Sequence, residues 1–257
     1  MVEILPLIDE PVITVENDIK VLVIADIHIG IERDLGRSGI NIPSQTDKLV
    51  NKILTIVRSL KPEKVVILGD LKHNIPWTSW QEEDEIPLFL EKLSEEATID
   101  IAMGNHDGNL DQLIPRSHDI TVHKAQGFLL DGVGYFHGHA WPSSDLFRAD
   151  YILMGHNHPI VKLTDSLGYV KPIQVWVRAK LKSEVISSHY REIEYKDPSL
   201  VIVPAFNRLC GGVSVNSESR SLLGPLFTSN AVDIDSADIH LIDGTYIGDV
   251  RTARYQL

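Results

Sequence analysis

Histidines and carboxylates gather in five short segments of the sequence, each directly after an apolar run. The segments are Asp26-Ile27-His28, Gly69-Asp70-Leu71-Lys72-His73, Gly104-Asn105-His106-Asp107, His137-Gly138-His139 and Gly155-His156-Asn157-His158. Together they hold seven of the 11 histidines of the chain. Imidazole, carboxylate and carboxamide groups are nitrogen and oxygen ligands that suit manganese, iron or zinc. These residue types therefore predict a metal site.

The number of candidate ligands exceeds what one tetrahedral metal ion needs. Two metal ions that share a carboxylate fit better, and pairs about 3.5–4 Å apart recur in phosphoester cleavage. Such a pair lowers the pKa of a bridging water and makes hydroxide available near neutral pH. No protein nucleophile stands out, because Cys210 has no obvious partner and no G-x-S-x-G segment occurs. The expected reaction is hydrolysis of a phosphoester by a metal-bridging hydroxide.

The apolar runs before the five segments are typical of buried strands. They cover Lys20–Ala25, Lys64–Leu68, Ile99–Met103, Gly134–Phe136 and Tyr151–Met154. Ligands of open α/β sheets bind beyond the carboxyl ends of the strands, so all five segments are expected at one rim.

Two helices are expected between these strands. One begins at Ser44, which has capping-box spacing to Asp47, and ends before Pro62. The other covers residues 82–96, with Leu88 and Leu93 facing inward and the acidic start Glu82–Glu85 in solvent.

The chain continues with β-like patterns after Pro159. Residues Ile173–Lys182 alternate with period two, and Leu200–Val203 is a further strand. No second core is evident. We therefore expect an α/β (α+β-like) fold with two packed mixed β-sheets flanked by helices. A single domain would cover residues 1–257, with residues 160–257 completing the second sheet.

Composition restricts the class of protein. The chain has 257 residues, one cysteine and a net charge of −12. A single cysteine excludes an internal disulfide. The N-terminus does not resemble a signal peptide, and no apolar run approaches the roughly 20 residues of a membrane span. We expect a cytoplasmic protein with no membrane partner. The acidic charge does not suit stand-alone binding of duplex DNA.

The five segments, taken in order, resemble those of the calcineurin-like metallophosphoesterases. The likeness covers residues 20–159 and continues more weakly through Pro204–Gly212. It implies a metallophosphoesterase-type sandwich. It also implies that Asp26, His28, Asp70 and His158 hold one metal ion, and that Asp70, Asn105, His137 and His156 hold the other. The implied ions are two divalent cations, with Mn²⁺ expected first and iron, zinc or nickel as alternatives.

The resemblance implies further roles around the metals. His106 would contact the phosphate and protonate the leaving oxygen, and Asp107 would orient His106. His73 and His139 would be additional phosphate contacts or acid–base helpers. Arg33 is a further candidate for substrate binding. His118, His123, His189 and His240 belong to no segment and are expected to be structural or exposed.

The segment Gly69–His73 resembles the SbcD-type nucleases and, most closely, the archaeal SbcD-related phosphoesterases. This implies a Mn-dependent DNA nuclease of repair or recombination, acting as a single-strand endonuclease or a 3′→5′ exonuclease. The expected partner is single-stranded DNA. Because the chain is acidic, a homo-oligomer or a helicase or ATPase partner would supply affinity for DNA.

Two alternatives remain open at this stage. The same metals could hydrolyse a small phosphodiester such as a linear or cyclic nucleotide, or the fold could serve as a non-catalytic scaffold. A basic strip on Ile173–Lys182 bears on the choice. It carries Trp176, Arg178, Lys180 and Lys182, which could follow a single strand or simply form a solvated sheet face.

Overall fold

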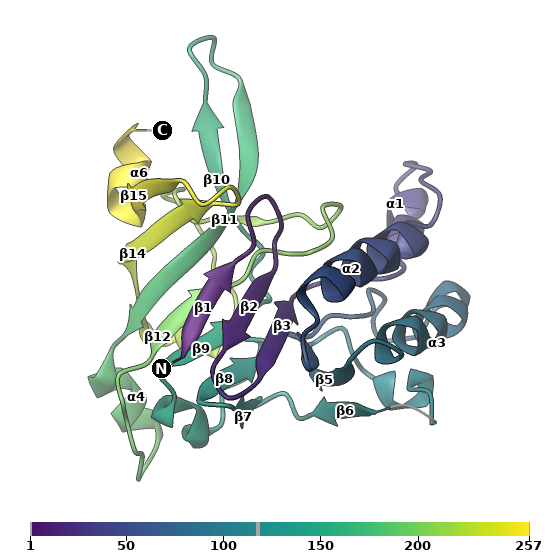
Figure 1. Cartoon of the computed structure of the whole chain (residues 1–257). Helices are drawn as coiled ribbons and strands as arrows, with labels where there is room; N and C mark the ends of the chain where they lie inside the picture. Colours follow the sequence, from purple (N-terminus) through teal and green to yellow (C-terminus); the bar gives the residue numbers. More distant parts are fainter. Residues whose placement is uncertain (1, 117–118, 257) are drawn as a thin grey trace.

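Two β-sheets packed face to face form the frame of the protein (Figure 1). The computed structural model describes residues 2–116 and 119–256. Sheet 1 has the strand order β1-β2-β3-β4-β5-β6. Its strands are β1 (Glu3–Pro6), β2 (Ile13–Glu16), β3 (Lys20–Ile24), β4 (Lys64–Ile67), β5 (Thr98–Ala102) and β6 (Ile120–His123). Strands β3 to β6 run parallel, and β1 and β2 add an antiparallel edge.

Sheet 2 has the order β13-β10-β11-β12-β9-β8-β7, and β14 pairs with β11 and β15. Its strands are β7 (Phe128–Leu130), β8 (Val133–Phe136), β9 (Tyr151–Met154), β10 (Pro159–Thr164), β11 (Val170–Leu181), β12 (Ser199–Ile202), β13 (Val213–Ser214), β14 (Val232–Leu241) and β15 (Tyr246–Asp249). Strands β8, β9 and β12 are parallel neighbours. Strands from before and after residue 160 thus share one sheet.

Most helices cover the outer faces of the two sheets. They are α1 (Ile31–Arg37), α2 (Thr46–Leu60), α3 (Trp80–Ser94), α4 (Ser183–His189), α5 (Pro225–Thr228) and α6 (Val250–Gln256). The inner sides of α2 and α3 pack on sheet 1 through residues such as Ile53 and Phe89. Helices α4, α5 and α6 contribute Ile186, Leu226 and Val250 to the apolar layer on sheet 2.

A third apolar layer lies between the sheets. Val21, Val23 and Val66 of sheet 1 meet Tyr135 and Leu153 of sheet 2 there. Alternate residues of β3 and β4 thus enter two different cores, which explains why both runs are apolar throughout. The expected fold class, two packed mixed sheets flanked by helices, is confirmed.

Several local predictions were wrong. Ser44 does not form a capping box with Asp47, because Gln45 is the N-cap residue of α2 and the Ser44 hydroxyl accepts from the Thr46 amide. The capping box lies at Ser79 of α3, which begins before the predicted helix. Glu82 is its acidic member and is fully buried rather than solvated.

The predicted inner face of α3 was only partly correct. Leu93 is buried, but Leu88 is about half exposed. Ile86, Phe89 and Leu90 complete the buried face.

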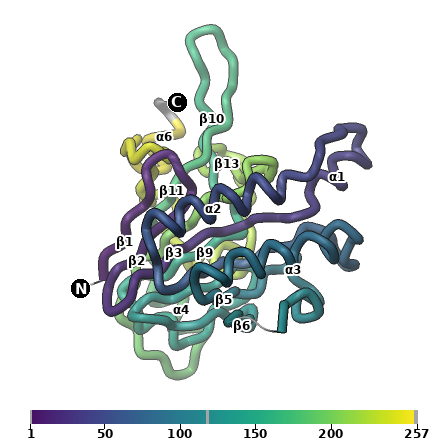
Figure 2. Tube along the Cα trace, turned by 45° about the vertical axis from the view of Figure 1, so that its right-hand side comes forward, coloured from purple at the N-terminus to yellow at the C-terminus, as the bar shows by residue number. Residues whose placement is uncertain are grey.

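The β10–β11 hairpin projects beyond the sandwich and is the most extended feature of Figures 1 and 2. It begins directly after His158. Within the described residues, no helix combines the length and apolar character needed to cross a membrane.

Candidate metal centre

The carboxyl ends of five strands meet at one rim of the sandwich. Asp26 and His28 follow β3, Asp70 follows β4 and Asn105 follows β5, all from sheet 1. His137 follows β8, and His156 and His158 follow β9, from sheet 2. Figure 2 gives a second view of these strands. The centre therefore receives side chains from both sheets.

One group of ligand-type atoms surrounds Asp26 and His28. His158 Nε2 lies 3.3 Å from Asp26 Oδ1, and His28 Nε2 lies 3.5 Å from Asp70 Oδ2. Ligand atoms of Asp26, His28 and Asp70 all fall within 4.8 Å of one another. Together with His158, these residues form the first set of four ligands that the family resemblance implies.

A second group surrounds His137. Its Nε2 atom lies 3.3 Å from Asp70 Oδ2, 3.1 Å from Asn105 Oδ1 and 3.1 Å from His156 Nδ1. Asp70 is close to both groups. This places the predicted bridging carboxylate between the two predicted ligand sets.

The donor atoms of this centre fit divalent cations. The Nε2 atoms of His28 and His158 are buried and make no hydrogen bond to any described residue. Leaving such atoms unpaired is costly unless something else satisfies them. A cation among these lone pairs and carboxylates would do so, and nitrogen and oxygen donors match the preferences of Mn²⁺, Fe²⁺ and Zn²⁺.

The backbone at the centre is unusual. Asp26, His28, Asp70, His156 and His158 all have positive φ values, between 42° and 70°. Residues other than glycine rarely adopt this left-handed conformation, and such strain concentrates at functional sites. The surrounding structure holds these residues in place so that their side chains converge.

Second partners fix the orientation of the histidine rings. His137 Nδ1 donates to the Leu68 carbonyl at 2.7 Å, and His158 Nδ1 donates to the Gly211 carbonyl at 3.0 Å. In both rings Nε2 is then the nitrogen that faces the carboxylates. Metal-bound histidines are commonly oriented in this way.

The electrostatics of the centre favour ionised carboxylates. Burial opposes ionisation of Asp26, but the attraction of His158 outweighs it and lowers the pKa of Asp26. Burial likewise opposes ionisation of Asp70, and the nearby His137 charge lowers the pKa of Asp70 strongly. Both carboxylates are therefore charged at neutral pH.

The histidines differ in protonation. Burial lowers the pKa of His28 to about 3 and the pKa of His156 to about 4, so both rings are neutral. At His137 the attraction of Asp70 overcomes burial and raises the pKa to about 9. Neutral imidazoles are the form that can donate a lone pair to a metal ion.

An open hollow of about 310 Å³ lies over the centre. Its lining includes His28, Asp70, Asn105, His106 and His158. His106 is half-buried at its wall, and its Nδ1 donates to the His73 carbonyl. The other ring nitrogen of His106 is therefore the one available to a bound phosphoester.

Asp107 has different partners from those expected. Its carboxylate is fully buried and accepts backbone N–H groups from Asp70, Leu71, Lys72 and Gly104 at 2.8–3.2 Å. No hydrogen bond to the His106 ring is present among the described residues. Asp107 thus holds the loop that carries Asp70, while the His73 carbonyl contacts His106.

The other predicted helpers lie at the edge of the centre. His73 Nδ1 is 3.1 Å from His28 Nδ1, and the rings of His139 and His137 are 5.4 Å apart. Arg33 lies farther out, with its guanidinium carbon 5.5 Å from the centre of the Trp80 ring. Of the four histidines outside the segments, His118 lies outside the described residues, and His123 pairs with Asp100.

Sequence reasoning missed the position of Cys210. Its sulfur and the ligand nitrogens of His28 and His158 lie within 4.8 Å of one another. Burial raises the pKa of the Cys210 thiol well above its usual value, so the sulfur is a neutral thiol. The only signal in the sequence was the weak family likeness of residues 204–212. This segment is held at the centre by the Asn207 side chain, which donates to the Ile27 carbonyl at 2.9 Å.

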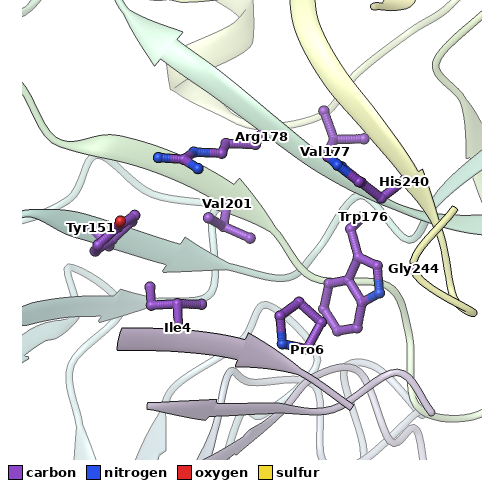
Figure 3. A pocket seen from close by; sticks show the side chains of 9 residues that line it. All are labelled: Ile4, Pro6, Tyr151, Trp176, Val177, Arg178, Val201, His240 and Gly244. Atoms are coloured by element: carbon purple, nitrogen blue, oxygen red, sulfur yellow. The ribbon is translucent and has the colours of Figure 1, made fainter. Parts of the chain in front are cut away.

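The basic strip on β11 does not lie at the candidate metal centre. Trp176 is buried between the sheets, and Lys180 pairs with Ser199 at the start of β12, the end opposite the centre. Trp176 and Arg178 line a separate hollow of about 320 Å³ together with Tyr151, as Figure 3 shows. Arg178 is held there by Tyr151 and by the Ser199 hydroxyl.

The chain is similar to solved structures of known proteins. Among solved structures, the chain is similar to nuclease MPE of Pseudomonas putida, with 16% identity, a TM-score of 0.55 and coverage of 94% of this chain and 98% of that one. It is also similar to YfcE, a phosphoesterase from E. coli, with 15% identity, a TM-score of 0.42 and coverage of 89% and 96%. At such identities the likeness to MPE shows the fold alone.

The sequence comparisons differ in outcome. No curated protein sequence matches the chain. The family model described as calcineurin-like phosphoesterase matches residues 19–191, which is more than half of the chain and contains every predicted metal ligand. The chain therefore belongs to the calcineurin-like phosphoesterase family.

Proposed function

We propose that this phosphoester hydrolase is a dinuclear-metal phosphodiesterase that cleaves single-stranded DNA. Family membership makes the chain a metal-dependent phosphoester hydrolase. The observation that carries the proposal is the position of Asp70, whose carboxylate lies 3.5 Å from His28 Nε2 and 3.3 Å from His137 Nε2. One carboxylate between two ligand groups is an arrangement that suits a pair of metal ions.

The two ligand groups would each hold one divalent cation, and we propose Mn²⁺. Their members are Asp26, His28, Asp70 and His158 for one ion, and Asp70, Asn105, His137 and His156 for the other. Bound there, the cations would supply a water of lowered pKa and neutralise charge on the phosphoryl oxygens.

His106 would act on the leaving group. The His73 carbonyl accepts the proton on Nδ1 of His106, so a proton on Nε2 of His106 can pass to the leaving oxygen. The Nε2–H group would also donate to the negative charge that develops on that oxygen. Asp107 supports this step indirectly, because it holds the loop of Asp70, whose Oδ1 accepts the His106 amide at 2.9 Å.

The preference for DNA has two supports. The chain shares its fold with a protein described as a nuclease, MPE. The segment Gly69–His73 resembles that of SbcD-related phosphoesterases, which implies a role in DNA repair or recombination. The openness of the hollow at one rim of the sandwich is compatible with an extended strand.

The test uses metal-stripped protein, added Mn²⁺ and end-labelled single-stranded DNA. Native protein is expected to cut the strand, and His106→Ala is expected to reduce turnover by roughly 10²–10⁴-fold, as for loss of a general acid. Asp70→Ala should abolish cleavage and weaken binding of Mn²⁺. Intact DNA in the presence of bound Mn²⁺ would refute the nuclease assignment.

A small phosphodiester is the second candidate substrate. The hollow of about 310 Å³ falls at the lower end of volumes that hold small ligands. Hydrolysis of linear or cyclic dinucleotides without cleavage of the labelled strand would favour this candidate. The fragment ladder from the labelled strand would otherwise give the polarity of the nuclease.

A further inference from the structure

Two tryptophan side chains stand in solvent on the segment that leaves the metal centre at His73. Trp77 is 78% exposed and Trp80 is 67% exposed. The other two tryptophans are covered: Trp176 is 4% exposed, and Trp141 stacks on His189 with ring centres 3.7 Å apart. A pair of exposed indoles within four residues is an unusual feature of a protein surface.

Both ends of the segment that carries the indoles are anchored. The buried Glu82 carboxylate accepts the backbone N–H groups of His73, Asn74 and Ser79 at 2.8, 2.7 and 2.5 Å. The buried Lys72 ammonium donates to the Asn74 carbonyl. A surface fixed before binding loses little conformational entropy when a ligand binds to it.

Both indoles belong to the segment that begins at the metal centre. Trp77 is four positions after His73, so their Cα atoms are at most about 14 Å apart. Trp80 packs against Arg33 of α1, and the next residue, Asp34, has its carboxylate 3.9 Å from His73 Nε2. Figure 2 shows α1 and α3 on the same side of the molecule.

We propose that Trp77 and Trp80 form a stacking platform for bases of the single strand whose phosphodiester lies at the metal centre. This inference rests on the proposed nuclease function. Every nucleobase has a face that can stack on an indole, and one stacked base changes affinity by about 5- to 150-fold. A chain with a net charge of −12 attracts the phosphate backbone poorly, so stacking would supply the affinity that charge does not.

The platform also has one cation beside it. Within the residues that the structure describes, the buried Arg33 Nη1 atom makes no hydrogen bond, and the guanidinium lies over the Trp80 ring. A cation on one face of the indole holds the ring in place. Arg33 would thus serve the substrate through Trp80 rather than by direct contact with the phosphate at the metals.

The test compares two substrates on the same variants. An oligothymidylate 12-mer reports strand binding, and bis(p-nitrophenyl) phosphate reports the metal centre alone. For Trp77→Ala/Trp80→Ala, the ratio of kcat/KM for the 12-mer to that for the small diester should fall at least tenfold. Trp77→Phe/Trp80→Phe should keep the ratio within about threefold, because a ring remains. Leu167→Ala, an 80% exposed apolar residue on the hairpin tip, should keep the native ratio.

Other outcomes would overturn the platform. An unchanged ratio in the double alanine variant, with the 12-mer still cut, would reject the platform and leave the nuclease function standing. A native protein that hydrolyses the small diester but not the 12-mer would reject both. If light scattering shows a native dimer that the alanine variant breaks, with an unchanged ratio, the indoles belong to an interface between copies of the chain.

Discussion

At the scale of single residues, the Asp26 carboxylate approaches the backbone of Gly155 too closely to admit a side chain. A Cβ atom at Gly155 would lie 2.7 Å from Asp26 Oδ2 and 3.1 Å from the Leu68 carbonyl. The same carboxylate accepts the His156 amide at 3.1–3.2 Å. The glycine thus lets β9 deliver His156 and His158 directly against Asp26.

Gly155→Ala should therefore damage the metal centre. The added methyl group must displace Asp26, so the Kd for Mn²⁺ should rise at least tenfold, which is about 1.4 kcal/mol. Isothermal titration of metal-free protein measures this. Gly108→Ala is the matched control, because a Cβ there meets nothing within 4 Å. Equal Kd values for both variants would contradict the steric explanation.

The sequence predicted which residues gather at the centre, but not what each one contacts. Position after an apolar run was enough to bring Asp26, Asp70 and His137 to one rim, because parallel strands end together. The partners of Asp107 depend on the path of the loop after Asp70, which has no signature in spacing. The left-handed backbone at the ligands is likewise imposed by tertiary contacts and not by local propensity.

At the scale of elements, one carboxylate links three neighbouring strands of sheet 1. Asp100 of β5 lies 2.7 Å from Lys64 Nζ of β4 and 2.6 Å from His123 Nε2 of β6. Burial opposes ionisation of Asp100, but hydrogen bonds from His123 and Lys64 outweigh it and lower the pKa of Asp100. The ionised form of Asp100 is thus more stable in the folded state than in the unfolded state.

The sign of the pH dependence follows. Because the folded pKa of Asp100 is depressed, its stabilisation is complete above the ordinary carboxyl pKa of about 4 and is lost as pH falls below it. Asp100→Asn should lower Tm by about 3–6 °C at pH 7, for a loss of about 1.5 kcal/mol. The gap between native and variant should narrow between pH 5 and pH 3, as measured by calorimetry. The exposed Asp84→Asn is the control, and a gap independent of pH would argue against this ion pair.

The sequence predicted the strands that are buried on both faces of a sheet, but it missed strands at the edges of sheet 1. Strands β3, β4 and β9 were found within a residue or two, because each enters two apolar layers. Strands β1 and β6 lie at the edges of sheet 1 and have mixed burial, so their patterns are weak. The capping box was placed at Ser44 instead of Ser79 because both positions have the same spacing, and only the contacts of Glu82 distinguish them.

At the scale of the whole molecule, the candidate metal centre lies where the two sheets meet. Asp26, His28, Asp70 and Asn105 come from sheet 1, while His137, His156 and His158 come from sheet 2. Each ligand group contains residues from both sheets. Cations at the centre would therefore cross-link the sandwich at the rim where charged and polar groups replace the apolar layer.

Metal binding should consequently stabilise the fold as well as the site. An ion that binds the folded state alone, at 100 times its Kd, adds about 2.7 kcal/mol, which corresponds to about 5–10 °C in Tm for a chain of this size. Scanning calorimetry of stripped protein with and without Mn²⁺ measures the shift. Asp70→Asn should lose most of this increase in Tm, because the Asp70 carboxylate faces both ligand groups. His240→Gln alters a histidine in the hollow of Figure 3 and should keep the full shift. Equal shifts in native protein and Asp70→Asn would mean that Mn²⁺ binds elsewhere and that the two sheets are held together by their apolar layer alone.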